Sequence, residues 1–487
     1  MAIYRTNNPT EFAEIDGIVI DETSPPSGMQ GLSTNVVALV GLFPRGGHLA
    51  KAVGSIGELY AEYGNSIAYS GIQALQNKKF GSLKIVRVEP TSSAVSTRIL
   101  SDATPVEIIT FRSLHKGVYG NLIRITVSAG TVEGRRYFIE DTDSNTVIQP
   151  ESYDNINLPD YASAAAANAA GIFAGSKLIT AEVLAVTANP VSGAGVLLEN
   201  GSDGTPGDTD YEAALSRIEF DAAANIVFLD VYTPARNTYL KNHAALTQDR
   251  MVILAGPEAE STAEAVTAAG SYRDSDGRII YAYPWVQSVI NGTNQFVSPA
   301  HFYASLLSQC PPQVDPAYVE NSQFLAGITG LKRTLARADF IALNRAGVSC
   351  FEYDADIGYK IRNGVTTQVL STAKIPILRR RMTDLLTNSA ARFMKNYQNT
   401  VNSDENRKAV KAAILAYVKG RQDEKLLPRD VDIKKGKVTL VDVDSLNSDE
   451  SIAEGFFYVI WRQRIFSSMR YIILKAEIGT SVSITEG

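Results

Sequence analysis

The chain has few of the residues that build disulfide frameworks and metal sites. Only Cys310 and Cys350 occur among its 487 residues, which is too few for a disulfide framework or a thiolate metal site. The four histidines are each more than fifty residues apart, so no two of them form a local ligand pair such as H-E-x-x-H. We therefore expect no metal and no cofactor.

Excess positive charge and long apolar runs are also lacking. Lys and Arg number 46 against 52 Asp and Glu, a net charge of -6, which argues against a surface built mainly to bind nucleic acid. The longest apolar runs, 36–43 and 456–461, are far shorter than the roughly 18 to 20 residues of a membrane span. The first residues carry no signal-peptide or transit-peptide pattern. We expect a soluble protein made in the cytoplasm, with no direct nucleic-acid contact and no membrane insertion.

Motifs for enzymatic chemistry are incomplete wherever they begin. Residues 41–48, GLFPRGGH, follow an apolar run as a phosphate-binding loop follows its strand. Gly47 and His48, however, stand where that loop needs Lys and Ser or Thr. Residues 64–68, GNSIA, lack the second glycine of a nucleophile elbow. The sequence thus predicts no catalytic residue and a protein that is not an enzyme.

The pattern of apolar residues divides the chain into regions. Residues 1–30 read as an extended arm with one β-prone block at 15–20, whereas 31–90 and 208–370 alternate short apolar strands with helices. Such alternation predicts an α/β domain with a largely parallel sheet. The strand-like runs are 36–42, 83–88, 225–231, 251–254 and 278–283, and helices are expected at 66–79, 210–220 and 258–269. Residues 91–207 carry β-prone blocks and an Ala-rich helix candidate at 162–170, which predicts an inserted β-rich domain.

The last region, 371–487, begins with two helices. Apolar residues recur at helical spacing from 378 to 397, and a second helix is expected from 402 to a stop at 419–420. Residues 371–425 hold twelve Lys and Arg against five Asp and Glu, a net charge of +7 that leaves -13 for the rest. Lys408, Lys411 and Lys419 fall within roughly a third of the helix circumference. They form either an ordinary solvated face or a face that docks onto an acidic partner.

The chain ends in a second β-prone arm. Ile472, Leu474 and Ile478 lie on one face of a strand, and the alternation continues through Val482. Unpaired backbone groups on an arm are satisfied when it adds to the edge of another sheet. Two such arms on a folded body therefore indicate strand exchange between subunits.

A series of short segments carries a family resemblance. It comprises VVALVGLFPRG at 36–46, SIGELYAEYG at 55–64, LKIVRV at 83–88, YAYPWV at 281–286, LNRAGV at 343–348 and LRRR at 378–381. In this order they resemble the tail sheath proteins of contractile phage tails and related contractile injection machines. The resemblance covers the first ninety residues and most of 210–487, and none of it falls in 91–207.

The resemblance implies a structural subunit that stacks as hexameric rings around an inner tail tube and contracts to drive the tube through the target envelope for genome ejection. Its implied partners are other copies of itself, the inner tail tube protein, and baseplate and tail terminator proteins. The implied location is the virion tail, assembled in the host cytoplasm. The implied fold is α/β and α+β multidomain: an α/β core, an inserted β-rich domain, and a C-terminal helical and sheet domain with strand-exchanging arms.

The resemblance also assigns roles to residues. The arm strands, in a sheet shared among neighbouring subunits, are expected around Ile15, Ile18, Val19, Ile20, Ile472, Leu474, Ile478 and Val482. Our hypothesis for the tube-facing surface is Lys408, Lys411 and Lys419. Three alternatives stay open: the sheath of a tailocin, extracellular injection system or secretion machine; an α/β ligand-binding protein or enzyme; and a closed-shell capsid protein.

Overall fold

The computed structural model describes residues 2–5, 17–20, 29, 35–143, 148–221, 224–371, 373–432 and 436–470. Its contacts divide the chain into two units. The larger is Ser33–Arg381, and the smaller joins Met1–Leu32 to Met382–Gly487. Each unit has its own buried apolar clusters.

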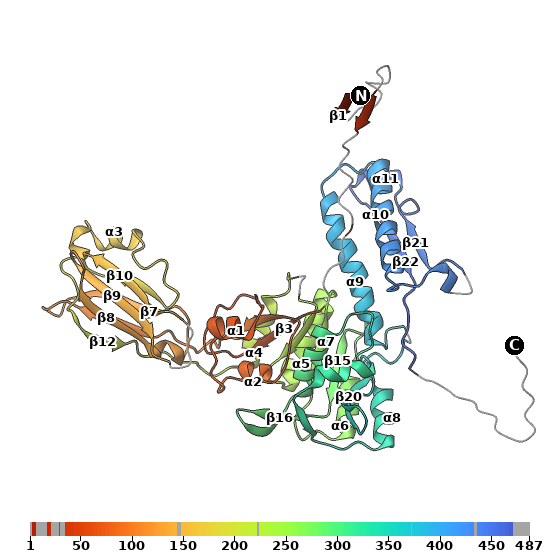
Figure 1. Cartoon of the computed structure of the whole chain (residues 1–487), viewed down its shortest axis with the longest axis horizontal. Coiled ribbons are helices and arrows are strands. Elements are labelled where there is room, and N and C mark those ends of the chain that lie inside the picture. Colours follow the sequence, from red (N-terminus) through yellow and green to blue (C-terminus); the bar gives the residue numbers. More distant parts are fainter. Residues whose placement is uncertain are drawn as a thin grey trace, which may run out of the picture. The chain divides into compact units, whose positions relative to one another are not determined.

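The larger unit is built on an eight-stranded sheet (Figure 1). Its strands are β3 (Val36–Gly41), β4 (Lys51–Val53), β5 (Ser82–Arg87), β13 (Ile226–Leu229), β14 (Met251–Ala255), β15 (Ile279–Tyr283), β19 (Val348–Asp354) and β20 (Gly358–Ile361). Their order is β20-β19-β15-β14-β13-β3-β5-β4. The six interior strands are parallel, and the edge strands β4 and β20 pair antiparallel. All five predicted strands of the α/β region are present.

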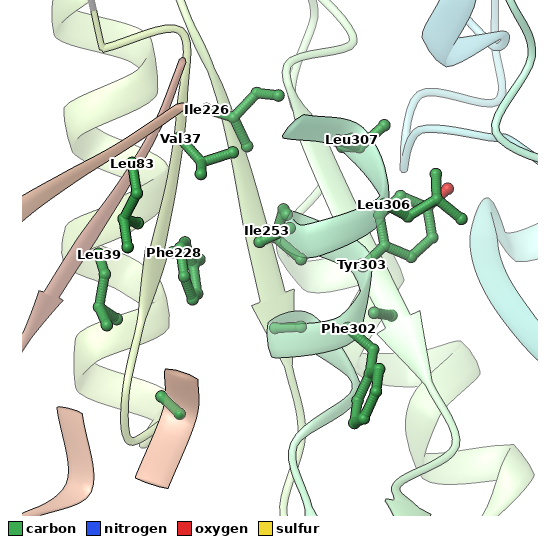
Figure 2. Packing of buried hydrophobic residues seen from close by; sticks show 14 of the residues in the cluster. Val37, Leu39, Leu83, Ile226, Phe228, Ile253, Phe302, Tyr303, Leu306 and Leu307 are labelled. Atoms are coloured by element: carbon green, nitrogen blue, oxygen red, sulfur yellow. The ribbon is translucent and has the colours of Figure 1, made fainter. Parts of the chain in front are cut away.

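The four central strands β3, β13, β14 and β15 are apolar throughout because helices cover both faces of the sheet. The helices of this layer are α1 (Ile56–Tyr63), α2 (Ser70–Leu75), α4 (Asp208–Ser216), α5 (Pro234–Thr247), α6 (Thr262–Ser271), α7 (Pro299–Gln309) and α8 (Arg337–Ala346). Along β3, Val37 and Leu39 belong to the cluster packed by α7, whereas Ala38 and Val40 belong to the cluster of α4, α5, α6 and α8. Figure 2 shows α7 laid against the strands by its apolar side chains, among them Phe302. A small sheet of β16 (Val286–Ile290), β17 (Thr293–Val297) and β18 (Ile328–Leu331) follows β15.

Residues 91–207 form two antiparallel sheets around their own apolar core. One sheet has the order β10-β9-β8-β12, with β8 (Ile123–Ala129), β9 (Arg135–Asp141), β10 (Glu151–Ile156) and β12 (Gly193–Leu197). The other is β11-β7-β6, with β6 (Thr97–Ser101), β7 (Glu107–Ser113) and β11 (Ile179–Val183). The Ala-rich segment forms α3 (Ala164–Ala169).

The smaller unit packs two helices on a β-ribbon. Its elements are α9 (Ile377–Met394), which begins in the larger unit, α10 (Asp404–Asp423), α11 (Asp449–Ala453), β21 (Thr439–Asp442) and β22 (Ile460–Gln463). The side chain of Ser403 caps α10 by accepting a hydrogen bond from the backbone N–H of Asn406 at 3.2 Å. The helices bury a shared stripe made of Met382, Leu385, Leu386, Phe393, Val410, Ile414, Tyr417 and Val418.

Four helix predictions were wrong at their ends. The helix expected over 210–220 ends at Ser216, and the helix expected over 258–269 begins at Thr262. The helix expected over 66–79 is only α2, because Gln76 leaves the helical region and Asn77 adopts a φ of 58°, a left-handed conformation that asparagine tolerates. The helix expected to stop at Gly420 continues to Asp423. A glycine inside a helix costs only about 1 kcal/mol, and the burial of Tyr417 and Val418 one turn earlier outweighs it.

Candidate assembly surfaces

Helix α10 carries the three predicted lysines on one side. Lys408 and Lys419 are exposed, and Lys411 is half-buried. At 100° per residue, Lys419 lies about 20° around the helix from Lys408, and Lys411 about 60° in the other direction. Leu415, an apolar side chain 42% exposed, lies between them. The face is therefore cationic with an apolar centre, and its contact with a tube protein stays a prediction.

Two of these lysines have acidic neighbours in the same unit. Lys408 Nζ lies 2.6 Å from Asp404 Oδ2, and Lys411 Nζ lies 3.8 Å from Asp444 Oδ2. The hydrogen bond from Lys408 to Asp404 raises the pKa of the lysine. Among the described residues, Lys419 makes no ion pair. Water screens both charges of an exposed pair, so a partner's carboxylates can replace these two.

Sequence reasoning missed the role of both aspartates. The pair of Asp404 with Lys408 has a local signal, because acidic and basic residues four positions apart on a helix lie side by side. The pair of Lys411 with Asp444 has none, because it depends on the turn after β21 lying beside α10.

The ribbon of β21 and β22 has open edges in the described part of the chain. The two strands pair antiparallel, with Val441 opposite Trp461 and Leu440 opposite Arg462, and they have no third partner there. Val441 is buried with the helices, whereas Leu440 is 42% exposed. A two-stranded ribbon is marginally stable by itself, and an added strand would use its free backbone groups.

The N-terminal arm contains two short strands. β1 (Ala2–Arg5) and β2 (Gly17–Ile20) pair in parallel. The predicted arm residues Ile18, Val19 and Ile20 lie in β2, whereas Ile15 lies outside the described residues. The sequence prediction missed β1, although its β-prone Ile3 and Tyr4 were a signal. The C-terminal arm residues Ile472, Leu474, Ile478 and Val482 also lie outside the described residues.

The place where open parallel sheets hold ligands is filled in this chain. The strand order reverses between β3 and β13, and a ligand crevice forms beyond the strand ends at such a point. There Asp230 accepts hydrogen bonds from the Leu42 backbone N–H at 2.7 Å, from Tyr211 Oη at 2.8 Å and from Ser70 Oγ. A Cβ on Gly41 would lie 2.7 Å from Asp230 Cγ. The crevice is thus occupied by a side chain whose bonds are satisfied within the chain.

The described ranges lack two further kinds of feature. They hold no group of three His, Cys, Asp or Glu side chains placed to bind a metal. No helix within them is long and apolar enough to cross a membrane. Cys310 and Cys350 are both buried and unbonded to each other.

The chain is thus a multidomain α/β protein with an inserted pair of antiparallel sheets and a unit of helices and ribbon. No family model and no curated protein matches its sequence. Solved structures do match: the sheath tail protein of Listeria innocua superposes with a TM-score of 0.65 at 13% identity, covering 90% of this chain and 96% of that chain.

Two further structures agree with this match. The sheath tail protein of Desulfitobacterium hafniense gives a TM-score of 0.61 at 16% identity, and the match covers 92% of this chain and 100% of that chain. The helical sheath of the anti-feeding prophage in its contracted state gives a TM-score of 0.58 at 13% identity, and the match covers 95% of this chain and 99% of that chain. The fold is therefore that of contractile tail sheath proteins, and the resemblance predicted from the sequence is confirmed at the level of the fold.

Proposed function

We propose that this chain is the subunit of a contractile sheath, which stacks as hexameric rings around an inner tail tube and contracts to drive the tube through a target envelope for genome ejection. The observation that carries the proposal is a fold shared with sheath tail proteins over nine-tenths of the chain. Such a role needs contacts between subunits that survive motion and a weaker contact to the tube.

Electron microscopy of the purified full chain, expressed alone, tests the proposal. We expect long hollow cylinders, because a sheath subunit polymerises without its tube into the lower-energy packing. A monodisperse small oligomer would instead favour the α/β ligand-binding reading, and closed shells would favour a capsid protein.

The lasting contact between subunits is proposed to be strand exchange. The N-terminal strand β2 and the C-terminal arm around Leu474 would add to the open edges of the β21–β22 ribbon of other copies. The free edges of that ribbon and the short, otherwise marginal pair of β1 and β2 support this arrangement.

A proline substitution tests whether main-chain hydrogen bonds hold the arm. Leu474→Pro removes a backbone donor and should prevent cylinders, because proline cannot join the interior of a sheet. Leu474→Val keeps the β-prone side chain and is the matched control, expected to assemble normally. Cylinders from the proline variant at the parental yield would overturn the strand-exchange proposal.

The weaker contact is proposed to be the α10 face with Lys408, Lys411 and Lys419, opposite acidic groups of a tube protein. Each exposed ion pair contributes little, but a ring repeats it in every subunit, so the summed contact is strong while each pair remains breakable.

Charge reversal tests this contact. Changing the three lysines to Glu should prevent assembly around a co-expressed tube protein while tube-free cylinders still form. The matched control reverses three surface arginines of the inserted domain, the half-buried Arg98 and Arg112 and the exposed Arg124, with the same change in net charge. Normal tube-filled sheaths from the lysine variant would refute the assignment.

The alternatives separate on other observations. The sheath of a tailocin, an extracellular injection system or a secretion machine has the same sheath physics and differs in cargo, so the neighbouring genes distinguish them. An enzyme or ligand-binding reading of the α/β layer loses support because Asp230 fills the crevice that it would use.

A further inference from the structure

The chain leaves the α/β domain for the inserted domain near Thr91 and returns near Gly207. Asp210, in the first turn of α4, accepts hydrogen bonds from Thr91 N–H at 3.1 Å and from Gly207 N–H at 2.8 Å. The outgoing and returning segments also pair, because Ala94 and Ser202 exchange backbone hydrogen bonds of 2.8 and 3.1 Å. The two crossings are therefore clamped together rather than linked by a free hinge.

A buried arginine lies at the centre of the junction. Arg45, in the loop after β3, is 2% exposed. Its Nη1 donates to Tyr119 Oη at 2.7 Å and to Asp141 Oδ2 at 3.1 Å, both in the inserted domain. Its Nη2 donates to the carbonyls of Tyr60 and Ala61, each at 3.0 Å, at the end of α1. One guanidinium thus binds both domains at once.

Arg45, Tyr119 and Asp141 also contact one another. Tyr119 donates a hydrogen bond to Asp141, and the Arg45 guanidinium lies 4.7 Å from the Tyr119 ring centroid. The Asp141 side chain is fully buried. A buried carboxylate and guanidinium are costly to separate, because each is left as an uncompensated charge away from water.

A second arginine repeats the pattern from β5. Arg87, 3% exposed, donates to the carbonyls of Phe43 and Gly46 in the α/β domain at 3.1 and 3.2 Å. It also donates to the carbonyl of Lys116 in the inserted domain at 2.7 Å. Glu89 completes the contact, with Lys116 Nζ 3.1 Å from its Oε1.

A third contact crosses the junction at the returning segment. Asp203 accepts from Tyr69 Oη of the α/β domain at 2.7 Å and from the backbone N–H of Val118 at 2.9 Å. Gly117 stands at a φ of +125°, and a Cβ there would lie 2.7 Å from Asp203 Oδ1. Only glycine permits this close approach.

We propose that Arg45, Tyr119 and Asp141 form the centre of a polar joint that holds the inserted domain in one fixed orientation on the α/β domain. A rotation of the inserted domain would move Asp141 away from Arg45, while the Arg45 guanidinium stays hydrogen-bonded to the carbonyls at the end of α1. The joint, and not linker flexibility, therefore sets where the inserted domain points. The inference goes beyond the proposed function.

Hydrogen exchange followed by mass spectrometry on the full chain tests the joint. In Arg45→Met the backbone N–H groups of Ala94, Gly117 and Ser202 should exchange at least about tenfold faster, because breaking a buried ion pair strongly favours the open form. Exchange in the centres of β3 and β8 should not change. Arg98→Met is the matched control, since Arg98 forms an exposed pair with Glu199 close to the same crossing.

Two further variants keep the test decisive. If Arg45→Met also loosens β3 or β8, the volume-conserving Asp141→Asn takes its place and should show the selective acceleration. The double variant Arg45→Met/Asp141→Leu should regain part of the protection, because neither charge is then left alone. Equal exchange at the three junction amides in the Arg98→Met control and the Arg45 or Asp141 variant would overturn the proposal.

Discussion

Replacing Asp230 tests whether the filled crevice of the α/β sheet stabilises the fold. In Asp230→Ala the donors of Leu42, Ser70, Tyr211 and Val231 lose their acceptor. A buried donor left without an acceptor costs about 1 to 3 kcal/mol. If two of the four remain unpaired, the free energy of unfolding should fall by about 4 kcal/mol.

A second substitution measures the space that Asp230 occupies. Gly41→Ala places a methyl group 2.7 Å from Asp230 Cγ, and overpacking of this kind costs about 1 to 3 kcal/mol. In the Asp230→Ala background the Cγ and Oδ2 contacts are gone and only the contact with Cβ, at 2.9 Å, remains, so Gly41→Ala should cost less. The two effects should therefore be non-additive.

Urea unfolding, followed by tryptophan fluorescence, provides the assay. The chain has two tryptophans, so a Trp461→Phe background leaves Trp285 as the reporter of the larger unit. An unchanged m-value would show that the same surface is exposed on unfolding. If Asp230→Ala stays within about 1 kcal/mol of its parent, burying the carboxylate costs as much as its hydrogen bonds return, and the reasoning is refuted.

Three further predictions concern other parts of the chain. Burial raises the pKa of Glu260 from 4.5 in the unfolded chain to about 7 in the fold. Between these pH values the folded protein binds a proton that the unfolded chain has released, so the free energy of unfolding should fall by about 3 kcal/mol as the pH rises from 4.5 to 7. Glu260→Gln should flatten that fall in urea midpoints taken across the range, and an unchanged slope would contradict it. Ser403→Ala should destabilise the smaller unit by about 1 kcal/mol, read from Trp461 fluorescence, with Ser403→Asp as the neutral control. Phe302→Ala, at a site with no exposed surface, should lower the free energy of unfolding of the larger unit by about 3 to 5 kcal/mol; a Trp285 midpoint that does not move would contradict this.

The parallel sheet could be predicted because its strands are apolar on both faces. Val37, Ala38, Leu39 and Val40 are all fully buried, and an uninterrupted apolar run of this length indicates a strand covered by helices on both sides. Helix ends were less predictable. Gly420 after Lys419 is typical of a helix end, but packing of the preceding turn lets α10 continue to Asp423.

The polar contacts could not be predicted because they join distant parts of the chain. Arg45 stands in the segment GLFPRGGH, where it has no local partner, and Asp141 lies 96 positions away. Asp230 likewise follows an ordinary apolar strand, and its donors come from three other elements. A side chain that is satisfied only in the folded state leaves no periodic signal in the sequence.

The paired crossings of the inserted domain have a consequence for engineering. Because Ala94 and Ser202 lie side by side, the α/β domain offers two neighbouring attachment points. Any module whose ends lie as close together could be grafted between them. A grafted module without a hydrogen-bond acceptor at this place would not replace the bonds that Arg45 donates to Tyr119 and Asp141. An exchangeable cassette at this position must therefore supply its own acidic or hydroxyl group at the seam.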